Sequence, residues 1–239
     1  MIVKNSLLNS NYVIYQNDEW FKFSIDSVLL CNFVSLNLKC KKIMDLCCGN
    51  AAIAMMLSLK SKADIHGLEL QKCVFDLGIK SINENSMNDR IKLINGDLKN
   101  INDFYSADSF DTVICNPPYF NTFDDGFFNI NDVKKIARHE VNFSLDDLFS
   151  CVFYLLKTGG NFAMVHRSSR FIEIIEKLRK YKLEPKKVQF IFPKESKDSD
   201  LFLIECSKNG NTGLKILPSL ILHNDDGTYF DNIRKMFDL

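Results

Sequence analysis

The sequence of 239 residues has no net charge, no long apolar run and no paired cysteine spacing. Its 30 Lys and Arg balance 30 Asp and Glu, which argues against a protein whose whole surface is a basic coat for nucleic acid. No run of about 18 or more apolar residues occurs, so we expect no membrane span. The first residues, Met1–Ser6, lack the long apolar segment of a secretory signal.

The eight cysteines are scattered rather than paired, at positions 31, 40, 47, 48, 73, 115, 151 and 206. Zinc sites of the common kinds need closely spaced pairs of ligands, which this pattern does not offer. We therefore expect reduced thiols in a cytoplasmic protein without a bound metal. Internal repeats, low-complexity segments and an interdomain linker are also lacking, and residues 1–239 are predicted to form one domain.

Charge is unevenly distributed along the chain. Residues 177–197 contain eight basic and two acidic residues, a local charge of +6, whereas residues 97–132 contain seven aspartates and one lysine, a local charge of −6. Such asymmetry suits a protein that meets a polyanion along one side. A solvated helix face followed by a lysine-rich loop would give the same pattern, and both interpretations stay open here.

From residue 42 onward short apolar runs alternate with longer helical stretches, the pattern of a doubly wound α/β sheet. We expect strands near Lys42–Leu46, Ile65–Leu70, Ile91–Asn95, Phe110–Cys115 and Asn161–Val165. We expect helices over Ala51–Leu59, Lys72–Glu84, Leu145–Leu156 and Ser169–Lys180. Ser144 and Asp147 form an approximate capping box for the third helix, and Gly159-Gly160 is expected to stop it.

The flanks of this alternation predict smaller elements. At the start, Val13–Gln16 and Trp20–Phe23 read as a β-hairpin, followed by a short helix over Ser24–Leu30 capped by Ser24 or Asp26. After the alternation, the sequence predicts an antiparallel strand pair of Val188–Phe192 with Leu201–Cys206. Two short strands over Leu214–Leu217 and Leu220–His223 and a closing helix over Asp231–Phe237 are expected to follow.

Asn116-Pro117-Pro118-Tyr119 directly follows the expected strand Phe110–Cys115. Two prolines cannot continue a strand, and each restricts the residue before it to extended geometry, so Asn116 is held stiffly at the strand's carboxyl end. Ligands of open α/β sheets bind at that edge. An Asn side chain complements an exocyclic amine, and Tyr119 offers a flat face on which a base can stack.

Acidic residues follow the other expected strands. Asp45 comes near the end of the first strand and Glu69 near the end of the second. Glu69 lies 20 residues after Gly49, the separation at which Rossmann-type sheets place an acid on ribose hydroxyls. Asp97 follows the third strand. Each acid alone could be a cap or turn residue, but the ordered set predicts a nucleoside-containing ligand at this edge.

These segments resemble those of S-adenosylmethionine-dependent N-methyltransferases, which act on adenine N6, guanine N2 or the glutamine side-chain amide. Asp45–Ala51 resembles their Asp-x-Gly-x-Gly-x-Gly motif, with Cys47 and Ala51 in place of the first and third glycines. The resemblance implies a class I, Rossmann-like α/β fold with a mostly parallel seven-stranded sheet, an antiparallel final hairpin and helices on both faces. Residues 1–40 would cover the cofactor site, 41–210 form the core and 211–239 a C-terminal extension.

Within this group the chain resembles the bacterial tRNA adenine-N6 methyltransferases that modify position 37 of a valine tRNA. The resemblance rests on Phe23–Leu30, Arg138-His139-Glu140, Pro193–Asp200 and Asp225–Tyr229. It implies a small, monomeric enzyme with S-adenosylmethionine as cofactor and tRNA as partner, and no membrane or metal.

The resemblance also implies roles for individual residues. The catalytic residues would be Asn116, Pro117 and Tyr119. The residues that bind the cofactor would be Asp26, Asp45, Cys47, Gly49, Asn50, Glu69, Leu70, Asp97, Leu98 and Asn116. The residues that contact the substrate would be Pro118, Tyr119, Phe120, Arg138, His139, Lys194 and Lys197. An ion pair of Arg138 with Glu140 or Asp146 is an equal alternative to RNA contact.

Three alternatives remain from the sequence. Release-factor glutamine methyltransferases share the tetrapeptide but carry a helical domain before the cofactor fold, where this sequence has about 41 residues before the first expected strand. Guanine-N2 rRNA methyltransferases usually have a second, duplicated domain. A nicotinamide-dependent oxidoreductase or a nucleotide-binding module without catalysis fits the fold alone.

Overall fold

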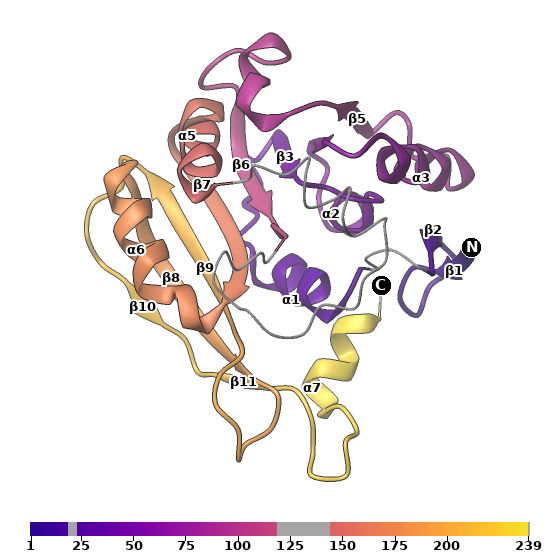
Figure 1. Ribbon diagram of the computed structural model, residues 1–239, viewed down its shortest axis with the longest axis vertical. Coiled ribbons are helices and arrows are strands. Elements are labelled where there is room, and N and C mark those ends of the chain that lie inside the picture. The colour runs from indigo at the N-terminus through magenta and orange to yellow at the C-terminus, as the bar shows by residue number, and fades with distance from the viewer. Residues whose placement is uncertain (19–22, 119–143, 239) are drawn as a thin grey trace.

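A computed structural model describes residues 1–18, 23–118 and 144–238 (Figure 1). Its central feature is a nine-stranded sheet in which β10, β8, β9, β7, β6, β3, β4 and β5 follow one another, and β11 also pairs with β8. A separate two-stranded sheet of β1 and β2 lies at the N-terminus.

The strands of the central sheet are β3 (Lys42–Leu46), β4 (Asp64–Glu69), β5 (Ile91–Asn95), β6 (Phe110–Cys115), β7 (Leu156–Arg167), β8 (Leu183–Phe192), β9 (Leu201–Lys208), β10 (Lys215–Ile216) and β11 (Leu220–Ile221). From β5 to β7 all neighbours are parallel. Strand β9 runs antiparallel between β7 and β8. The predicted mostly parallel sheet with a final antiparallel hairpin is therefore confirmed, and β10 and β11 extend the expected seven strands to nine.

The helices are α1 (Ile25–Phe33), α2 (Ala52–Lys60), α3 (Lys72–Glu84), α5 (Leu145–Leu155), α6 (Phe171–Lys180) and α7 (Asp231–Arg234). Short 3-10 turns are η1 (Leu98–Asp103), η2 (Ser168–Arg170) and η3 (Lys235–Phe237). No helix among the described residues is long and apolar enough to cross a membrane.

Two hydrophobic clusters, one on each face of the sheet, form the core. The first joins β3 and β4 to α1 and α2 through side chains such as Leu29, Ile43 and Met55. The second joins β6 and β7 to α5 and α6 through side chains such as Phe110, Phe149 and Phe162. Helices therefore cover both faces, as Figure 1 shows, because each buried strand presents apolar side chains alternately to the two sides.

The N-terminal hairpin contains a strand that was not predicted. Strand β2 (Val13–Asn17) pairs with β1 (Ile2–Ser6), and most of the strand expected to pair with it, Trp20–Lys22, lies outside the described residues. Strand β1 was missed because four of its five residues are exposed, which leaves little apolar pattern to detect. Ser24 takes the N-cap position of α1, but its side chain makes no capping hydrogen bond.

Helix α5 begins as predicted and ends one residue before the expected Leu156, but glycine does not stop it. The Ser144 hydroxyl accepts a hydrogen bond from the Asp147 backbone N–H. The helix stops at Leu155 and β7 starts at Leu156, so Gly159 and Gly160 lie within the strand rather than at the helix end.

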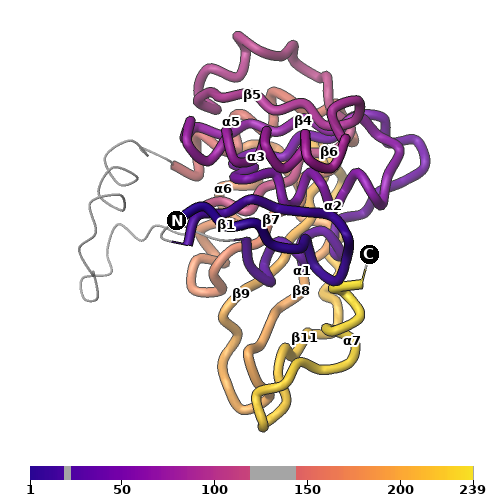
Figure 2. Tube along the Cα trace, turned by 90° about the vertical axis from the view of Figure 1, so that its right-hand side faces the viewer, coloured from indigo at the N-terminus to yellow at the C-terminus, as the bar shows by residue number. Residues whose placement is uncertain are grey.

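The C-terminal segment packs on the outer part of the sheet. Residues of β10 and β11 add to β8 in parallel, and Figure 2 shows the segment beside β8 and β11. The backbone N–H of Asn9 donates to the carbonyl of Phe237 at 3.0 Å, so this segment also meets the N-terminal hairpin.

Candidate active site

Four predicted site residues lie at one edge of the sheet, at or just beyond the carboxyl ends of adjacent strands. Across the sheet, Leu46 of β3 pairs with Cys115 of β6 and with Leu68 of β4, and Glu69 of β4 pairs with Asn95 of β5. Asp45, Glu69, Asp97 and Asn116 are each within two residues of one of these positions. The parallel register therefore brings the four together, as the sequence predicted.

The loop between β3 and α2 has a backbone shape that usually requires glycine. Cys47, Gly49 and Ala51 all have positive φ, at 57°, 57° and 69°. The left-handed conformation is thus kept at both positions where glycine is replaced. A Cβ placed on Gly49 would meet no atom within 4 Å, whereas one on Gly78 of α3 would lie 3.4 Å from the Gly49 carbonyl oxygen. The loop is therefore backed by α3 and open in front.

Glu69 binds this loop from the end of β4. Its carboxylate accepts the Gly49 N–H at 2.9 Å through Oε2 and the Gln71 N–H at 2.8 Å through Oε1. Burial raises the pKa of Glu69, and the backbone N–H groups of Gln71, Gly49 and Leu70 oppose that rise. Each oxygen keeps a second lone pair for another donor. Glu69 thus fits the role of binding two neighbouring hydroxyls.

Asp45 is fully buried, and neither of its carboxyl oxygens has a hydrogen-bond partner among the described residues. Burial raises its pKa well above the ordinary range, and the charge of Glu69 adds to this rise. Buried polar groups are normally paired. An unpaired carboxyl beside the loop fits a site that is completed by a ligand or by water.

The remaining cofactor candidates take mixed positions. Asp97 begins η1, where its carboxylate accepts the Lys99 N–H at 2.9 Å. Leu98 is buried in the second hydrophobic cluster, and Leu70 is partly exposed next to Glu69. Asn95, which the prediction did not assign a role, donates to the Glu69 and Leu70 carbonyls at 2.8 and 2.9 Å, and so fixes the ends of β4 and β5 together.

Asn116 lies where β6 ends, with Pro117 buried behind it and Pro118 half-buried. Its side-chain Nδ2 donates to the Ser27 hydroxyl at 3.2 Å. Ser27 follows Asp26 in the first turns of α1, so the helix predicted to cover the cofactor site does lie against the candidate catalytic residue. Sequence reasoning missed Ser27, and no motif marks it.

Asn50 connects the loop to the N-terminal hairpin. Its Nδ2 donates to the Tyr15 carbonyl at 3.0 Å, while the Tyr15 N–H donates to the Ser81 hydroxyl of α3 at 2.9 Å. Residues of the first 40 thus border the predicted cofactor loop. Tyr119, Phe120, Arg138 and His139, predicted to act in catalysis or substrate contact, lie outside the described residues.

Four of the eight basic residues between 177 and 197 have acidic partners. Lys177 and Lys180 pair with Asp146 of α5. These two lysines, with the Tyr181 hydroxyl, lower the pKa of the Asp146 carboxyl below its usual range. Arg179 pairs with Glu184 at 3.3 Å and Lys187 with Glu205 at 3.5 Å. These pairs therefore neutralise part of the local charge of +6.

Lys194 and Lys197 differ from these residues. Both lie in the loop between β8 and β9, and Lys194 donates to the backbone carbonyl of Asp225 at 3.0 Å. No carboxylate within 4.0 Å of either ammonium is recorded for the described part of the chain. Because Leu201 at the start of β9 pairs with Arg167 at the carboxyl end of β7, this loop lies at the same sheet edge as Asn116.

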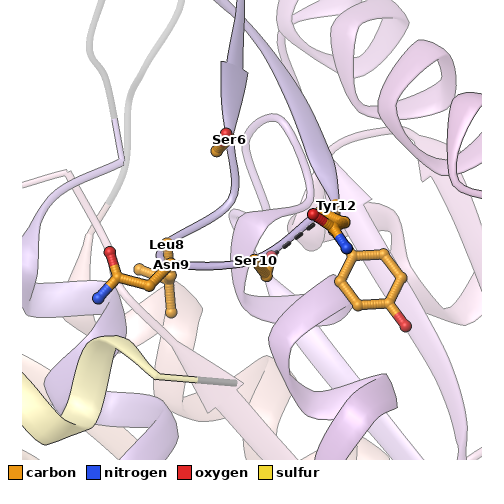
Figure 3. Close-up of a pocket in the computed structure, with 6 residues that line it drawn as sticks. Ser6, Leu8, Asn9, Ser10 and Tyr12 are labelled. Atoms are coloured by element: carbon orange, nitrogen blue, oxygen red, sulfur yellow. Dashed lines mark hydrogen bonds between the residues drawn. The ribbon is translucent and has the colours of Figure 1, made fainter.

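A hollow of about 620 Å³ lies at the turn between β1 and β2 and contains no predicted site residue. It is lined by Ser6, Leu8, Asn9, Ser10, Asn11 and Tyr12, five of which are labelled in Figure 3. Within residues 1–18, 23–118 and 144–238, no group of three or more His, Cys, Asp or Glu is arranged to hold a metal ion.

Relatives with assigned names are similar over most of the chain. A tRNA1(Val) (adenine(37)-N6)-methyltransferase of Aliivibrio salmonicida is 27% identical over 218 residues, which is 88% of this chain and 87% of the relative. A protein of the same name from Cytophaga hutchinsonii is 23% identical over 78% of this chain and 76% of the relative. The resemblance drawn from the sequence is thereby confirmed.

Solved structures share the fold. A predicted O-methyltransferase from Agrobacterium tumefaciens has a TM-score of 0.71 at 19% identity, covering 89% of this chain and 95% of that one. The Pyrococcus horikoshii protein TYW2 in complex with MeSAdo has a TM-score of 0.62 at 12% identity, covering 87% and 72%. The methyltransferase small domain family matches residues 20–182. With the sheet order and the residues at its carboxyl edge, this match shows that the chain belongs to the methyltransferase small domain family.

Proposed function

We propose that this protein transfers a methyl group from S-adenosylmethionine to N6 of adenosine 37 in a valine tRNA. The proposal rests on the position of the Asn116 side chain at the end of β6. Strand β6 pairs with β3, which leads into the β3–α2 loop, so Asn116 lies near that loop. The names of relatives that span most of the chain support the choice of substrate.

The residues at the sheet edge fit this cofactor. Glu69 would accept hydrogen bonds from the ribose hydroxyls, the loop around Gly49 would approach the rest of the molecule, and Asp97 would face the adenine edge. The loop's loss of two glycines matters less here than for a dinucleotide, because no phosphate has to be bound. When bound, S-adenosylmethionine supplies a methyl group on a positively charged sulfur.

Asn116 would act on the target amine without accepting its proton as a base. An aromatic amine donates its lone pair into the ring and is a poor nucleophile until its N–H groups are held by acceptors. The Asn116 side-chain carbonyl and the Pro117 backbone carbonyl are two such acceptors at adjacent positions. Alignment of the amine for in-line transfer then supplies much of the acceleration.

A tRNA substrate suits the remaining features. A base must leave its stack before its edge can be modified, and a loop nucleotide costs less to extrude than one in a duplex. Tyr119 would stack on the extruded base, with Phe120, Pro118, Arg138 and His139 as further substrate contacts. Lys194 and Lys197 would bind phosphates at the same sheet edge. The cytoplasm, where tRNA is found, is then the site of the reaction.

Mass spectrometry of nucleosides from bulk tRNA tests this proposal in cells. We expect a strain that lacks the gene to lose N6-methyladenosine from valine tRNA, and a plasmid copy with Asn116→Ala to leave that loss unrepaired. Loss of a methylated guanosine instead, or an unchanged nucleoside profile, would contradict the proposal.

A further inference from the structure

Ser27 of α1 forms a hydrogen bond with the side-chain amide of Asn116. The Nδ2 of Asn116 donates to Ser27 Oγ at 3.2 Å, across 89 residues of sequence. This distance lies within the usual range for an N–H···O hydrogen bond. Ser27 is 4% exposed, so its hydroxyl is directed inward rather than toward solvent.

Both partners are mounted on rigid parts of the fold. Helix α1 is anchored beyond Ser27 by Lys187, whose ammonium donates to the Phe33 carbonyl at 2.7 Å and the Ser35 hydroxyl at 2.9 Å. Glu205 accepts the Ser35 N–H at 2.6 Å. On the other side, Asn116 is fixed between β6 and two prolines.

The orientation of the Asn116 amide decides whether it can act on an amine. The two ends of a carboxamide have nearly the same shape, but one donates and the other accepts hydrogen bonds. If the group turned over, its N–H groups would face the N–H groups of the target amine. A partner that holds Nδ2 therefore also determines where the accepting oxygen points.

We propose that Ser27 is a positioning residue, which holds the Asn116 amide with its carbonyl oxygen directed to the target amine. This inference rests on the proposed function for its substrate. It assigns a role to α1 beyond covering the cofactor, because the same helix then sets the geometry of the catalytic side chain.

The first test separates positioning from binding. Ser27→Ala should lower kcat about three- to tenfold, the effect of one neutral hydrogen bond, while the Kd for S-adenosylmethionine and the KM for tRNA stay within about twofold. Ser27→Thr, which keeps the hydroxyl, should recover most of the loss. Ser58→Ala is the matched control and should leave kcat unaltered, because the Ser58 hydroxyl of α2 donates to the Met55 carbonyl of its own helix at 2.7 Å.

A double-mutant cycle shows whether Ser27 acts through Asn116. If it does, Ser27→Ala combined with Asn116→Ala should be no slower in single turnover than Asn116→Ala alone. Multiplying effects, or wild-type activity of Ser27→Ala, would overturn the inference while leaving the proposed function intact. Absence of methylation of valine tRNA by the wild type would instead contradict the proposed function.

A third measurement needs no substrate. In NMR spectra of the free protein, the side-chain amide protons of Asn116, assigned by their disappearance in Asn116→Ala, should exchange with water more slowly in the wild type than in Ser27→Ala. Equal exchange rates would overturn the inference whatever the enzyme methylates.

Discussion

Cys47 and Ala51 hold a backbone conformation that glycine adopts more easily. Both have positive φ in the loop that resembles a glycine-rich motif. For a residue with a Cβ, the left-handed conformation costs about 1–2 kcal/mol. The fold therefore keeps the shape of this loop at a cost in stability, which indicates that the shape itself is needed beside the cofactor site.

Because of this cost, replacement of cysteine by glycine should have opposite effects on the free energy of unfolding at Cys47 and at Cys73. Cys47→Gly should raise the free energy of unfolding by up to about 1 kcal/mol, because relief of the left-handed strain exceeds the extra entropy that glycine loses on folding. Cys73→Gly, in the first turn of α3 where φ is not positive, should lower it by up to about 1 kcal/mol. Urea denaturation measures both, and equal destabilisation by the two changes would contradict the strain argument.

Glu69 provides a prediction on cofactor affinity. Removing a charge-assisted hydrogen-bond acceptor costs about 1.5–3 kcal/mol, so Glu69→Ala should weaken S-adenosylmethionine binding roughly ten- to a hundredfold in calorimetry. Glu84→Ala is the control, since that carboxylate is exposed and paired with Lys4. Wild-type affinity of Glu69→Ala would remove Glu69 from the site.

The acids at the strand ends could be found from sequence because each lies at or near the end of a recognisable strand. Asp45, Glu69 and Asp97 then lie at one edge by the geometry of a parallel sheet alone. Ser27 could not be found in this way, because its partner Asn116 is 89 residues away. The link from Asn50 to Tyr15 spans 35 residues and likewise depends on how a hairpin packs on the sheet.

At the scale of elements, the loop between β8 and β9 differs from helix α6 in how its lysines are paired. Lys177 and Lys180 of α6 share Asp146, whereas Lys194 of the loop contacts a backbone carbonyl. A lysine paired with a carboxylate contributes less to attraction of a polyanion. Ion pairs thus neutralise part of the predicted basic region, and the lysines of this loop lie outside those pairs.

The lysine pairing predicts which substitutions affect RNA binding. Lys194→Ala with Lys197→Ala should weaken tRNA binding and reduce the slope of log K against log salt by about 1 for each lysine. Lys180→Ala should change that slope less, because Asp146 already neutralises the charge. Filter binding at several salt concentrations measures the slopes, and a larger effect of Lys180→Ala would contradict this assignment.

Elements with a clear apolar or helical pattern were predicted more accurately than exposed ones. The bounds of β3, β5, β6 and α3 match the expected ranges because apolar runs or a clear helical period mark them. Strand β1 is mostly exposed and was missed. The expected end of α5 is one residue from the observed Leu155, but the two glycines predicted to stop the helix lie within β7.

At the scale of the whole molecule, buried histidines and buried carboxyls have opposite effects on how the free energy of unfolding changes with pH. Burial lowers the pKa of His66 and of His166 to about 4. Between about pH 6.5 and 4 the unfolded chain binds protons at these histidines that the folded protein does not. The histidines therefore lower the free energy of unfolding as the pH falls through this range. The raised pKa values of Asp45 and Glu69 act in the other direction.

A single substitution isolates the histidine contribution. His66 hydrogen-bonds the Tyr105 hydroxyl at 2.8 Å inside a cluster of aromatic rings. His66→Gln should be less stable than the wild type at pH 7, and the difference in unfolding free energy should shrink as the pH is lowered through 6.5 toward 4. Denaturation series at several pH values measure it, and a difference independent of pH would contradict the shifted pKa.

The transfer reaction itself tests the central claim most directly. Purified enzyme and labelled S-adenosylmethionine are offered valine tRNA, the same tRNA with guanosine at position 37, and a peptide that carries the release-factor glutamine. The account predicts label on the first tRNA alone, located at N6 of adenosine 37. Label on the peptide, or equal label on the two tRNAs, would contradict it.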